Sequence, residues 1–357
     1  MLTEPEPVRW SQVPLRELEL EDRLVRAVTP YILEFQEVHE MVVDFFRIYQ
    51  QLVNPKATGV GPPEREANAE SYCVSGPQGE VGQFHVIYDL EETRLAIELP
   101  AEEASKVYRL LREQRIVVPD LELVRKVMSG NLAETVAAIF WQVGAIKVSL
   151  GDLRPLFKVD ENRNYSPIYI DVKGISYYPA VLDFVLSASA LLVRNLNFDV
   201  ICGIEAGSIA LAAILAQKLN KPMFFARRHL RYPEASPFEG VKQHELFRKR
   251  VLLVDDTLVH GWTKTRVVEV IRQWGAQVDA CFVIFDRQQG GEEELAHAGV
   301  RLYSLTNREA ALSEKIPREI SCLTDGEYVE VCSYFADPGE WHRRRGLNFT
   351  PIMKNLT

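Results

Sequence analysis

The chain of 357 residues is long enough for two domains, and 47% hydrophobic with 25% charged residues is the composition of an ordinary globular protein. Its formal net charge of −9 argues against nucleic-acid binding. No run of about 18 uncharged apolar residues indicates a membrane span. The five cysteines form no Cys-x-x-Cys pair and the N-terminus lacks a secretion signal, so we expect reduced thiols and a cytoplasmic protein.

The first part of the chain, residues 1–130, contains no recognisable catalytic motif. Apolar side chains between Tyr31 and Leu52 recur at steps of three and four, which predicts one long amphipathic helix. The segment 54–82 is rich in glycine and proline and is predicted to be a mobile connection. His85 has no metal-ligating residue at a suitable spacing, which favours a solvated side chain. Further expected elements are a β-hairpin at 84–90 and 94–99 and helices at 101–113 and 119–128.

One stretch suggests a ligand directly. A short buried strand at 251–254 ends in Asp255 and Asp256, and a helical pattern then runs from Thr263 to Gly275. Ligands of open α/β sheets bind at the carboxyl ends of strands, and a helix N-terminus points backbone N–H groups at an anion. Two carboxylates beside such a loop suggest a phosphorylated sugar.

Two neighbouring segments also suggest phosphate contacts. A strand at 199–203 leads into the small residues Ala206, Gly207 and Ser208, which let a backbone approach a ligand closely. The basic segment 227–240 contains arginines that bind diphosphate or form plain surface. The remaining expected elements are helices at 133–143, 180–193, 209–219 and 292–298 and strands at 223–226, 278–285 and 300–305.

The stretch 251–275 resembles the phosphoribosyl-diphosphate (PRPP) binding motif of type I phosphoribosyltransferases. Two flanking motifs, Ser166-Pro-Ile-Tyr-Ile-Asp171 and Asp286-Arg-Gln-Gln-Gly-Gly291, resemble the orotate phosphoribosyltransferases in particular. About two extra residues, placed within 162–165, separate Lys158 from the Ser-Pro. The resemblance covers 131–312. It implies an α/β protein with the type I phosphoribosyltransferase fold, an open, mostly parallel sheet with flanking helices and a small hood.

The resemblance also implies roles for individual residues. Asp255 and Asp256 would hold the ribose hydroxyls, and Arg231 would act with them from a mobile loop that closes over the neighbouring subunit. Mg²⁺ would accompany PRPP without direct protein ligands. The residues implied to bind PRPP are Ala206, Gly207, Ser208, Arg227, Arg228, Thr257, His260, Gly261 and Thr263. Those implied to face the base are Lys158, Tyr169 and Arg287.

The sequence departs from the family pattern at its phosphate contacts. Arg228 and Arg231 stand where lysines are expected, and arginine does not readily lose a proton. The phosphate loop reads Val259-His-Gly-Trp262 where Thr-x-Gly-(Ser/Thr) is usual. His260 either donates to phosphate when protonated or points to solvent, and Thr263 either caps the helix or supplies a hydroxyl.

We therefore expect an α+β domain at 1–130, a phosphoribosyltransferase domain at 131–312 and a C-terminal extension at 313–357. The run Arg343-Arg-Arg345 either reaches a phosphate or an acidic partner or is a solvated end. The resemblance implies a homodimer that transfers the phosphoribosyl group of PRPP to orotate, with no nucleic-acid or membrane partner. Two alternatives stay open: a changed base, and an impaired or inactive homologue that senses PRPP or a nucleotide.

Overall fold

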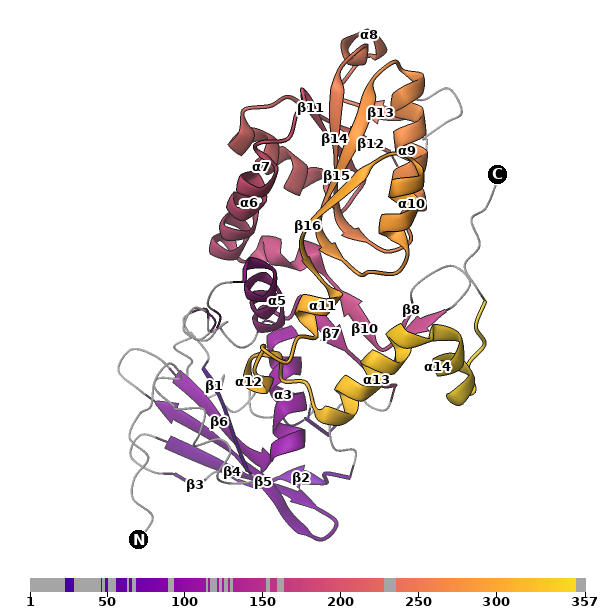
Figure 1. The fold of residues 1–357 in the computed structure, drawn as a ribbon. Coiled ribbons are helices and arrows are strands. Elements are labelled where there is room, and N and C mark those ends of the chain that lie inside the picture. The colour runs from indigo at the N-terminus through magenta and orange to yellow at the C-terminus, as the bar shows by residue number, and fades with distance from the viewer. Residues whose placement is uncertain are drawn as a thin grey trace. The chain divides into compact units, whose positions relative to one another are not determined.

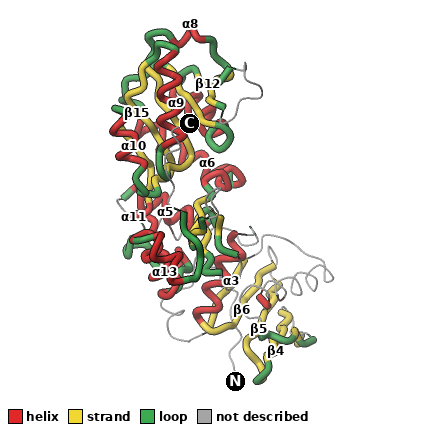
Figure 2. Tube along the Cα trace, turned by 90° about the vertical axis from the view of Figure 1, so that its right-hand side faces the viewer, coloured by secondary structure: helices red, strands yellow, loops and turns green. Residues whose placement is uncertain are grey.

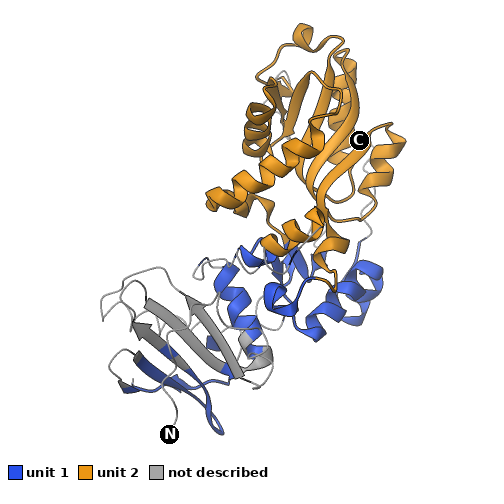
Figure 3. Cartoon of the chain, turned by 60° about the vertical axis from the view of Figure 1, so that its left-hand side comes forward, with its two compact units in different colours: residues 1–129, 141–169, 316–351 blue, residues 130–140, 170–315, 352–357 orange. Residues whose placement is uncertain are grey.

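The structure, a computed structural model, describes residues 23–28, 56–113 with short gaps, 131–151, 155–158, 164–227 and 236–350, and a few isolated positions before residue 131. The chain forms two compact units, each assembled from separate stretches (Figure 3). Unit 1 contains residues 1–129, 141–169 and 316–351, and unit 2 contains 130–140, 170–315 and 352–357. In the part of the chain that the structure describes, no helix is long and apolar enough to cross a membrane.

The described part of unit 2 is built on a six-stranded sheet. The strand order is β13-β12-β11-β14-β15-β16, and every neighbouring pair is parallel except β12 with β13. The central strands are apolar runs buried on both faces, as a parallel sheet covered by helices requires. The strands are β11 (Val200–Ile204), β12 (Met223–Ala226), β13 (Phe238–Glu239), β14 (Arg250–Leu258), β15 (Gln277–Asp286) and β16 (Arg301–Asn307).

Helices cover both faces of this sheet, with α6 and α7 on one side and α9 and α10 on the other (Figures 1 and 2). Val268 and Ile271 of α9 and Leu295 of α10 join the strands in one buried apolar cluster. The burial of this cluster holds the second layer on the sheet. The elements are α5 (Leu132–Gln142), η2 (Val172–Tyr177), α6 (Pro179–Val193), α7 (Ile209–Leu219), α8 (Gln243–Leu246), α9 (Trp262–Gln273), α10 (Gly291–His297) and α11 (Arg308–Ala311).

Unit 1 begins with an antiparallel sheet of order β1-β6-β5-β4-β2, with β3 paired to β4, followed by α3. β5 and β6 form the predicted hairpin, with Phe84 opposite Ile97. His85 hydrogen-bonds Ser71 Oγ through Nδ1 at 2.8 Å, so it is held in the sheet rather than fully solvated. The elements are β1 (Arg23–Val28), β2 (Gly59–Val60), β3 (Glu64–Arg65), β4 (Ala69–Gly76), β5 (Gly79–Tyr88), β6 (Thr93–Pro100) and α3 (Ala101–Glu113).

The prediction of a mobile connection at 54–82 is wrong. Strands β2, β3, β4 and the start of β5 occupy much of this segment, and the side chains of Tyr72 and Val74 are fully buried. Several of its described glycines and prolines lie at or next to the ends of strands. Gly79, for example, has a φ of 117° and begins β5 just after the β4–β5 turn.

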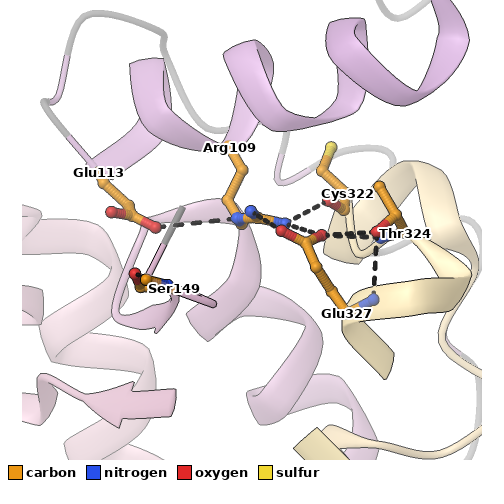
Figure 4. A network of polar contacts seen from close by, with 7 residues as sticks. Arg109, Glu113, Ser149, Cys322, Thr324 and Glu327 are labelled. Carbon is orange, nitrogen blue, oxygen red and sulfur yellow. Dashed lines mark hydrogen bonds and ion pairs between the residues drawn. The ribbon is translucent and has the colours of Figure 1, made fainter. Parts of the chain in front are cut away.

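The rest of unit 1 comes from the middle and the end of the chain. A buried ion pair joins α3 to α13: Arg109 donates to Glu327 with Nη1–Oε2 at 2.7 Å and Nη2–Oε1 at 2.5 Å (Figure 4). Arg109 also donates to the Cys322 carbonyl at 2.9 Å, and Thr324 caps α13. The elements are β7 (Ile146–Val148), β8 (Phe157–Lys158), β9 (Tyr165–Ser166), β10 (Ile168–Ile170), α12 (Arg318–Ser321), α13 (Asp325–Ala336) and α14 (Pro338–Arg344).

The regular elements predicted from residue 131 to 305 are confirmed to within about two residues, as is the helix at 101–113, with one exception. The strand predicted at 251–254 continues to Leu258, so Asp255 and Asp256 lie inside it. Most of the helices predicted at 31–52 and 119–128 lies outside the described residues. The three arginines at 343–345 make contacts within the chain, with Glu340, Ser333 and Glu330 respectively. The domain boundaries at 130 and 312 stay predictions.

Candidate functional site

Asp255 and Asp256 lie on β14 beyond the point where its neighbour β11 stops pairing. β11 follows β14 only as far as Gly203 opposite Val254, whereas β15 pairs with β14 up to Leu258. The acid pair therefore has a partner strand on one side only. On the other side it faces the turn between β11 and α7, where ligands of open α/β sheets bind.

Asp255 is locked in place by a buried lysine. The ammonium group of Lys264 donates to Asp255 Oδ2 at 2.5 Å and to the Thr257 carbonyl at 2.9 Å. The backbone N–H of Asp256 donates to Asp255 Oδ1 at 2.9 Å. Asp255 is only 6% exposed and Lys264 only 5%. Burial alone would lower the pKa of Lys264, but the charge of Asp255 raises it above its ordinary value.

Asp256 lies against the β11–α7 turn. A Cβ added at Gly207 would come within 2.1 Å of Asp256 Oδ2, so only glycine fits there without moving the carboxylate. Burial and the charge of Asp255 raise the pKa of Asp256 to about 6, against the opposing charges of Lys264 and Lys173. Asp256 therefore titrates between a proton-donating and a charged form close to neutral pH.

The turn itself is closed by a serine. The Ser208 hydroxyl accepts from the Ile204 N–H at 2.6 Å and donates to the Ile204 carbonyl at 2.7 Å. Ser208 is buried, while Ala206 is exposed and follows a cis peptide bond from Glu205. The serine side chain thus shapes the turn, and the exposed backbone around Ala206 is the part that a ligand can approach.

The loop between β14 and α9 contains two stacked rings. The ring centroids of His260 and Trp262 lie 5.1 Å apart, and the ring planes make an angle of 23°. His260 Nδ1 lies 2.9 Å from the Gln289 carbonyl, which only accepts, so this nitrogen donates. Gly261, with a φ of 83°, is the residue before the helix, and no side chain caps it. Thr263 is exposed on the first turn and does not cap the helix, so of its two alternatives only the supply of a hydroxyl to a ligand stays open.

The Asp286-Arg-Gln-Gln-Gly-Gly291 turn packs against the same loop. The Arg287 N–H donates to the Leu258 carbonyl at 2.9 Å, and the Arg287 side chain is only 5% exposed. A Cβ at Gly291 would meet Leu258 Cγ at 2.5 Å, which explains glycine there. Burial raises the pKa of Asp286, which accepts from the Gln288 N–H at 2.9 Å.

The basic segment after β12 is described only at its ends. Arg227 is half-buried and donates to Glu239 Oε1 through Nε at 2.8 Å and Nη2 at 2.6 Å. Its charge is therefore already compensated within the chain. Arg228 and Arg231 lie outside the described residues.

Two of the predicted base-binding residues belong to unit 1. Lys158 is exposed on β8, and the ring of Tyr169 stacks on Phe157 with centroids 5.6 Å apart. The Lys147 ammonium lies 6.0 Å from the centre of the Tyr169 ring, and Tyr169 is 36% exposed. Unit 1 therefore presents an aromatic pair with a cation beside it.

Sequence comparisons identify relatives across much of the chain. Residues 177–307 match the model of the phosphoribosyl transferase domain. The orotate phosphoribosyltransferase of Sulfolobus acidocaldarius is 34% identical over 39% of this chain and 70% of its own length. That of Methanopyrus kandleri is 32% identical over 48% and 87% respectively.

The chain belongs to the type I phosphoribosyltransferase family, in its orotate phosphoribosyltransferase-like branch. A crystal structure of orotate phosphoribosyltransferase from Aeropyrum pernix aligns with 50% of this chain and 97% of its own, with 26% identity and a TM-score of 0.44. The matched residues 177–307 include both acids, the Gly207 turn and Arg287.

Lys264 was not among the site residues predicted from the sequence. A signal was present, because Lys264, Val267, Val268 and Ile271 are spaced as the apolar face of a helix and all four are buried. A lysine on such a face requires a buried anionic partner. The individual binding roles suggested for the other residues stay predictions.

Proposed function

We propose that this protein transfers the phosphoribosyl group of PRPP to orotate, with release of pyrophosphate. The observation that supports it best is the contact between Asp256 and the Gly207 turn, at the strand ends of the fold that its orotate phosphoribosyltransferase relatives share. Several of these relatives match this chain over most of their own length.

In this proposal Asp256 accepts hydrogen bonds from the ribose hydroxyls. Asp255 contributes through its pair with Lys264, because both of its oxygens already receive donors from the chain. The backbone N–H groups from Thr257 to Thr263 bind the 5′-phosphate at the start of α9, where the helix dipole favours an anion.

The diphosphate end would meet the backbone of the 206–208 turn and the arginines at 227, 228 and 231. Arginine stays protonated at all accessible pH values, so Arg231 would stabilise charge on the leaving pyrophosphate without transferring a proton. Mg²⁺ bound to PRPP would neutralise part of the diphosphate charge. We assign no protein ligand to that ion.

At the base end we assign Lys158 and Arg287 to the substrate. Arginine presents a planar pair of donors that matches a carboxylate, such as that of orotate. The exposed Tyr169 ring offers an apolar face to a planar base.

The test is turnover. Purified protein is incubated with PRPP, Mg²⁺ and orotate, and the absorbance of orotate is followed. The proposal expects loss of orotate in the wild type and none with Asp256→Asn. A panel of other pyrimidine and purine bases tests a changed specificity. No turnover with any base, together with thermal stabilisation by PRPP, would contradict phosphoribosyl transfer and favour a protein that senses PRPP.

A further inference from the structure

The hairpin that contains Lys158 is small. β8 and β9 pair only at Phe157 with Ser166 and Lys158 with Tyr165, and form a two-stranded sheet. Two strands alone are marginally stable in water, so such a hairpin needs contacts from elsewhere. In unit 1 these contacts come from residues 337–350, near the end of the chain.

His342 makes the central contact. Its Nε2 accepts a hydrogen bond from the backbone N–H of Tyr165 at 2.9 Å, and its Nδ1 lies 2.6 Å from the Pro338 carbonyl. The imidazole is thus neutral, with its proton on Nδ1. His342 is fully buried, packed between the rings of Trp341 and Phe349. His342 thus accepts from the backbone N–H of Tyr165, the residue that lies directly opposite Lys158 in the hairpin.

Asn164 makes the second contact. Its side-chain amide donates to the Thr350 carbonyl at 2.7 Å and accepts from the Thr350 N–H at 3.0 Å. Asn164 is only 3% exposed, so this two-way bond is shielded from water. Asn164 and Tyr165 lie within the stretch 162–165, where about two residues more than in the family pattern are expected. This contact joins the hairpin to the end of the C-terminal segment.

Arg345 makes the third contact. Its Nη1 donates to the Leu150 carbonyl at 2.6 Å, upstream of β8, and its Nη2 donates to Glu330 at 3.0 Å. Trp341 also donates to Glu330, through Nε1 at 3.0 Å. Glu330 of α13 therefore holds α14 in place through Trp341 and Arg345. The end of the chain in turn bonds Leu150, before the segment that contains Lys158, and Tyr165, after it.

We propose that residues 337–350 are a positioning clamp for the Lys158 hairpin, with His342 and Asn164 as its positioning residues. The clamp sets the place of Lys158 and thereby the affinity for the base, while PRPP affinity depends on Asp256 and the β11–α7 turn. This inference rests on the proposed function, because that proposal assigns Lys158 to the base.

The experiment compares His342→Phe, which keeps an aromatic ring but removes the acceptor, with His342→Gln, whose amide oxygen restores an acceptor close to the position of Nε2. Asn164→Ala is a second, independent way to open the clamp. Arg343→Ala is the matched control, because Arg343 is an exposed residue of α14 that pairs with Glu340. Each full-length protein is measured for the KM of orotate, the KM of PRPP, and amide hydrogen exchange over residues 155–166.

His342→Phe and Asn164→Ala are expected to speed exchange at 164–166 and to raise the KM of orotate about fivefold, the factor that corresponds to one lost hydrogen bond. The KM of PRPP stays unchanged, and His342→Gln and Arg343→Ala behave as wild type. Faster exchange with an unchanged KM of orotate would overturn the positioning role. Unchanged exchange would overturn the clamp itself, and this readout decides even if the wild type shows no turnover.

Discussion

The ammonium group of Lys264 lies 2.5 Å from Asp255 Oδ2, and this buried ion pair distinguishes two acids that are adjacent in the sequence. Both oxygens of Asp255 receive donors from the chain, whereas Asp256 lies against the β11–α7 turn. The two carboxylates therefore have different environments and different expected consequences when they are changed.

Lys264→Met should destabilise the protein by about 3–5 kcal/mol, because it leaves the charge of Asp255 buried without its partner. Urea denaturation measures the free energy of unfolding. Lys218→Met is the matched control, since Lys218 pairs with the exposed Asp183 and such a pair contributes about 1 kcal/mol or less. Adding Asp255→Asn to Lys264→Met should recover part of the loss. Equal effects of the two lysine variants would contradict the buried pair.

Asp256→Asn should abolish PRPP binding without destabilising the protein. The pKa of Asp256 rises from an ordinary value of 3.8 to about 6 on folding, so its ionised form opposes folding at neutral pH. The variant should therefore unfold at an equal or higher temperature than wild type at pH 7.5. This difference in unfolding temperature should shrink as the pH falls toward 3.8, the ordinary pKa of an aspartate. A large loss of stability at pH 7.5 would show that the carboxylate has a structural role instead.

PRPP affinity should fall as the pH drops through about 6, because Asp256 then gains a proton and no longer accepts hydrogen bonds on both oxygens. Calorimetric titrations of PRPP and Mg²⁺ from pH 5 to 8 measure this dependence. The phosphates of PRPP also titrate in this range, so inorganic pyrophosphate serves as a parallel ligand that makes no ribose contact. A PRPP profile with the same shape as the pyrophosphate profile would rule out the contribution of Asp256.

Gly207→Ala should weaken PRPP binding at least tenfold, because the new methyl group overlaps Asp256 Oδ2 and moves the carboxylate or the turn. Gly326→Ala is the control: it lies in α13 and a Cβ there meets nothing within 4 Å. Alanine at that helical position should leave binding unchanged and stabilise slightly. Wild-type PRPP affinity in Gly207→Ala would mean that this turn does not border the site.

Glu327→Gln should destabilise unit 1 by about 3–5 kcal/mol at neutral pH, because Arg109 then remains charged and buried. Burial alone would raise the pKa of Glu327, but the charge and hydrogen bonds of Arg109 hold it below its ordinary value of 4.5. The stabilisation is thus complete above that value and lost as the pH falls through the folded pKa. Asp325→Asn, in the exposed pair with Arg318, should have little effect on stability, both at neutral pH and below the folded pKa of Glu327.

Much of unit 2 could be predicted from the sequence, because each of its central strands is an apolar run that ends in a polar turn. Asp255 and Gly207 were singled out because they follow apolar strand-like runs, and Arg287 through the resemblance of its motif to the orotate phosphoribosyltransferases. Lys264 was not found, because the β14–α9 turn brings its side chain back nine residues to Asp255. Local pattern does not specify that return.

The same limit explains the wrong prediction at 54–82 and the C-terminal contacts that the sequence did not indicate. Glycines and prolines between 54 and 82 were interpreted as one connection, although much of this segment forms strands that pair with one another. The hydrogen bond between His342 and Tyr165 spans 177 positions of the sequence, and that between Glu327 and Arg109 spans 218. No periodicity in the sequence indicates such contacts.

Phosphorus NMR of one reaction mixture tests the central claim most directly. Wild-type protein with Mg²⁺, PRPP and orotate should convert PRPP into orotidine monophosphate and pyrophosphate in equal amounts, with no conversion when orotate is omitted or when Asp256 is asparagine. PRPP that stays intact with the wild-type protein and orotate would contradict the assignment of phosphoribosyl transfer to this site.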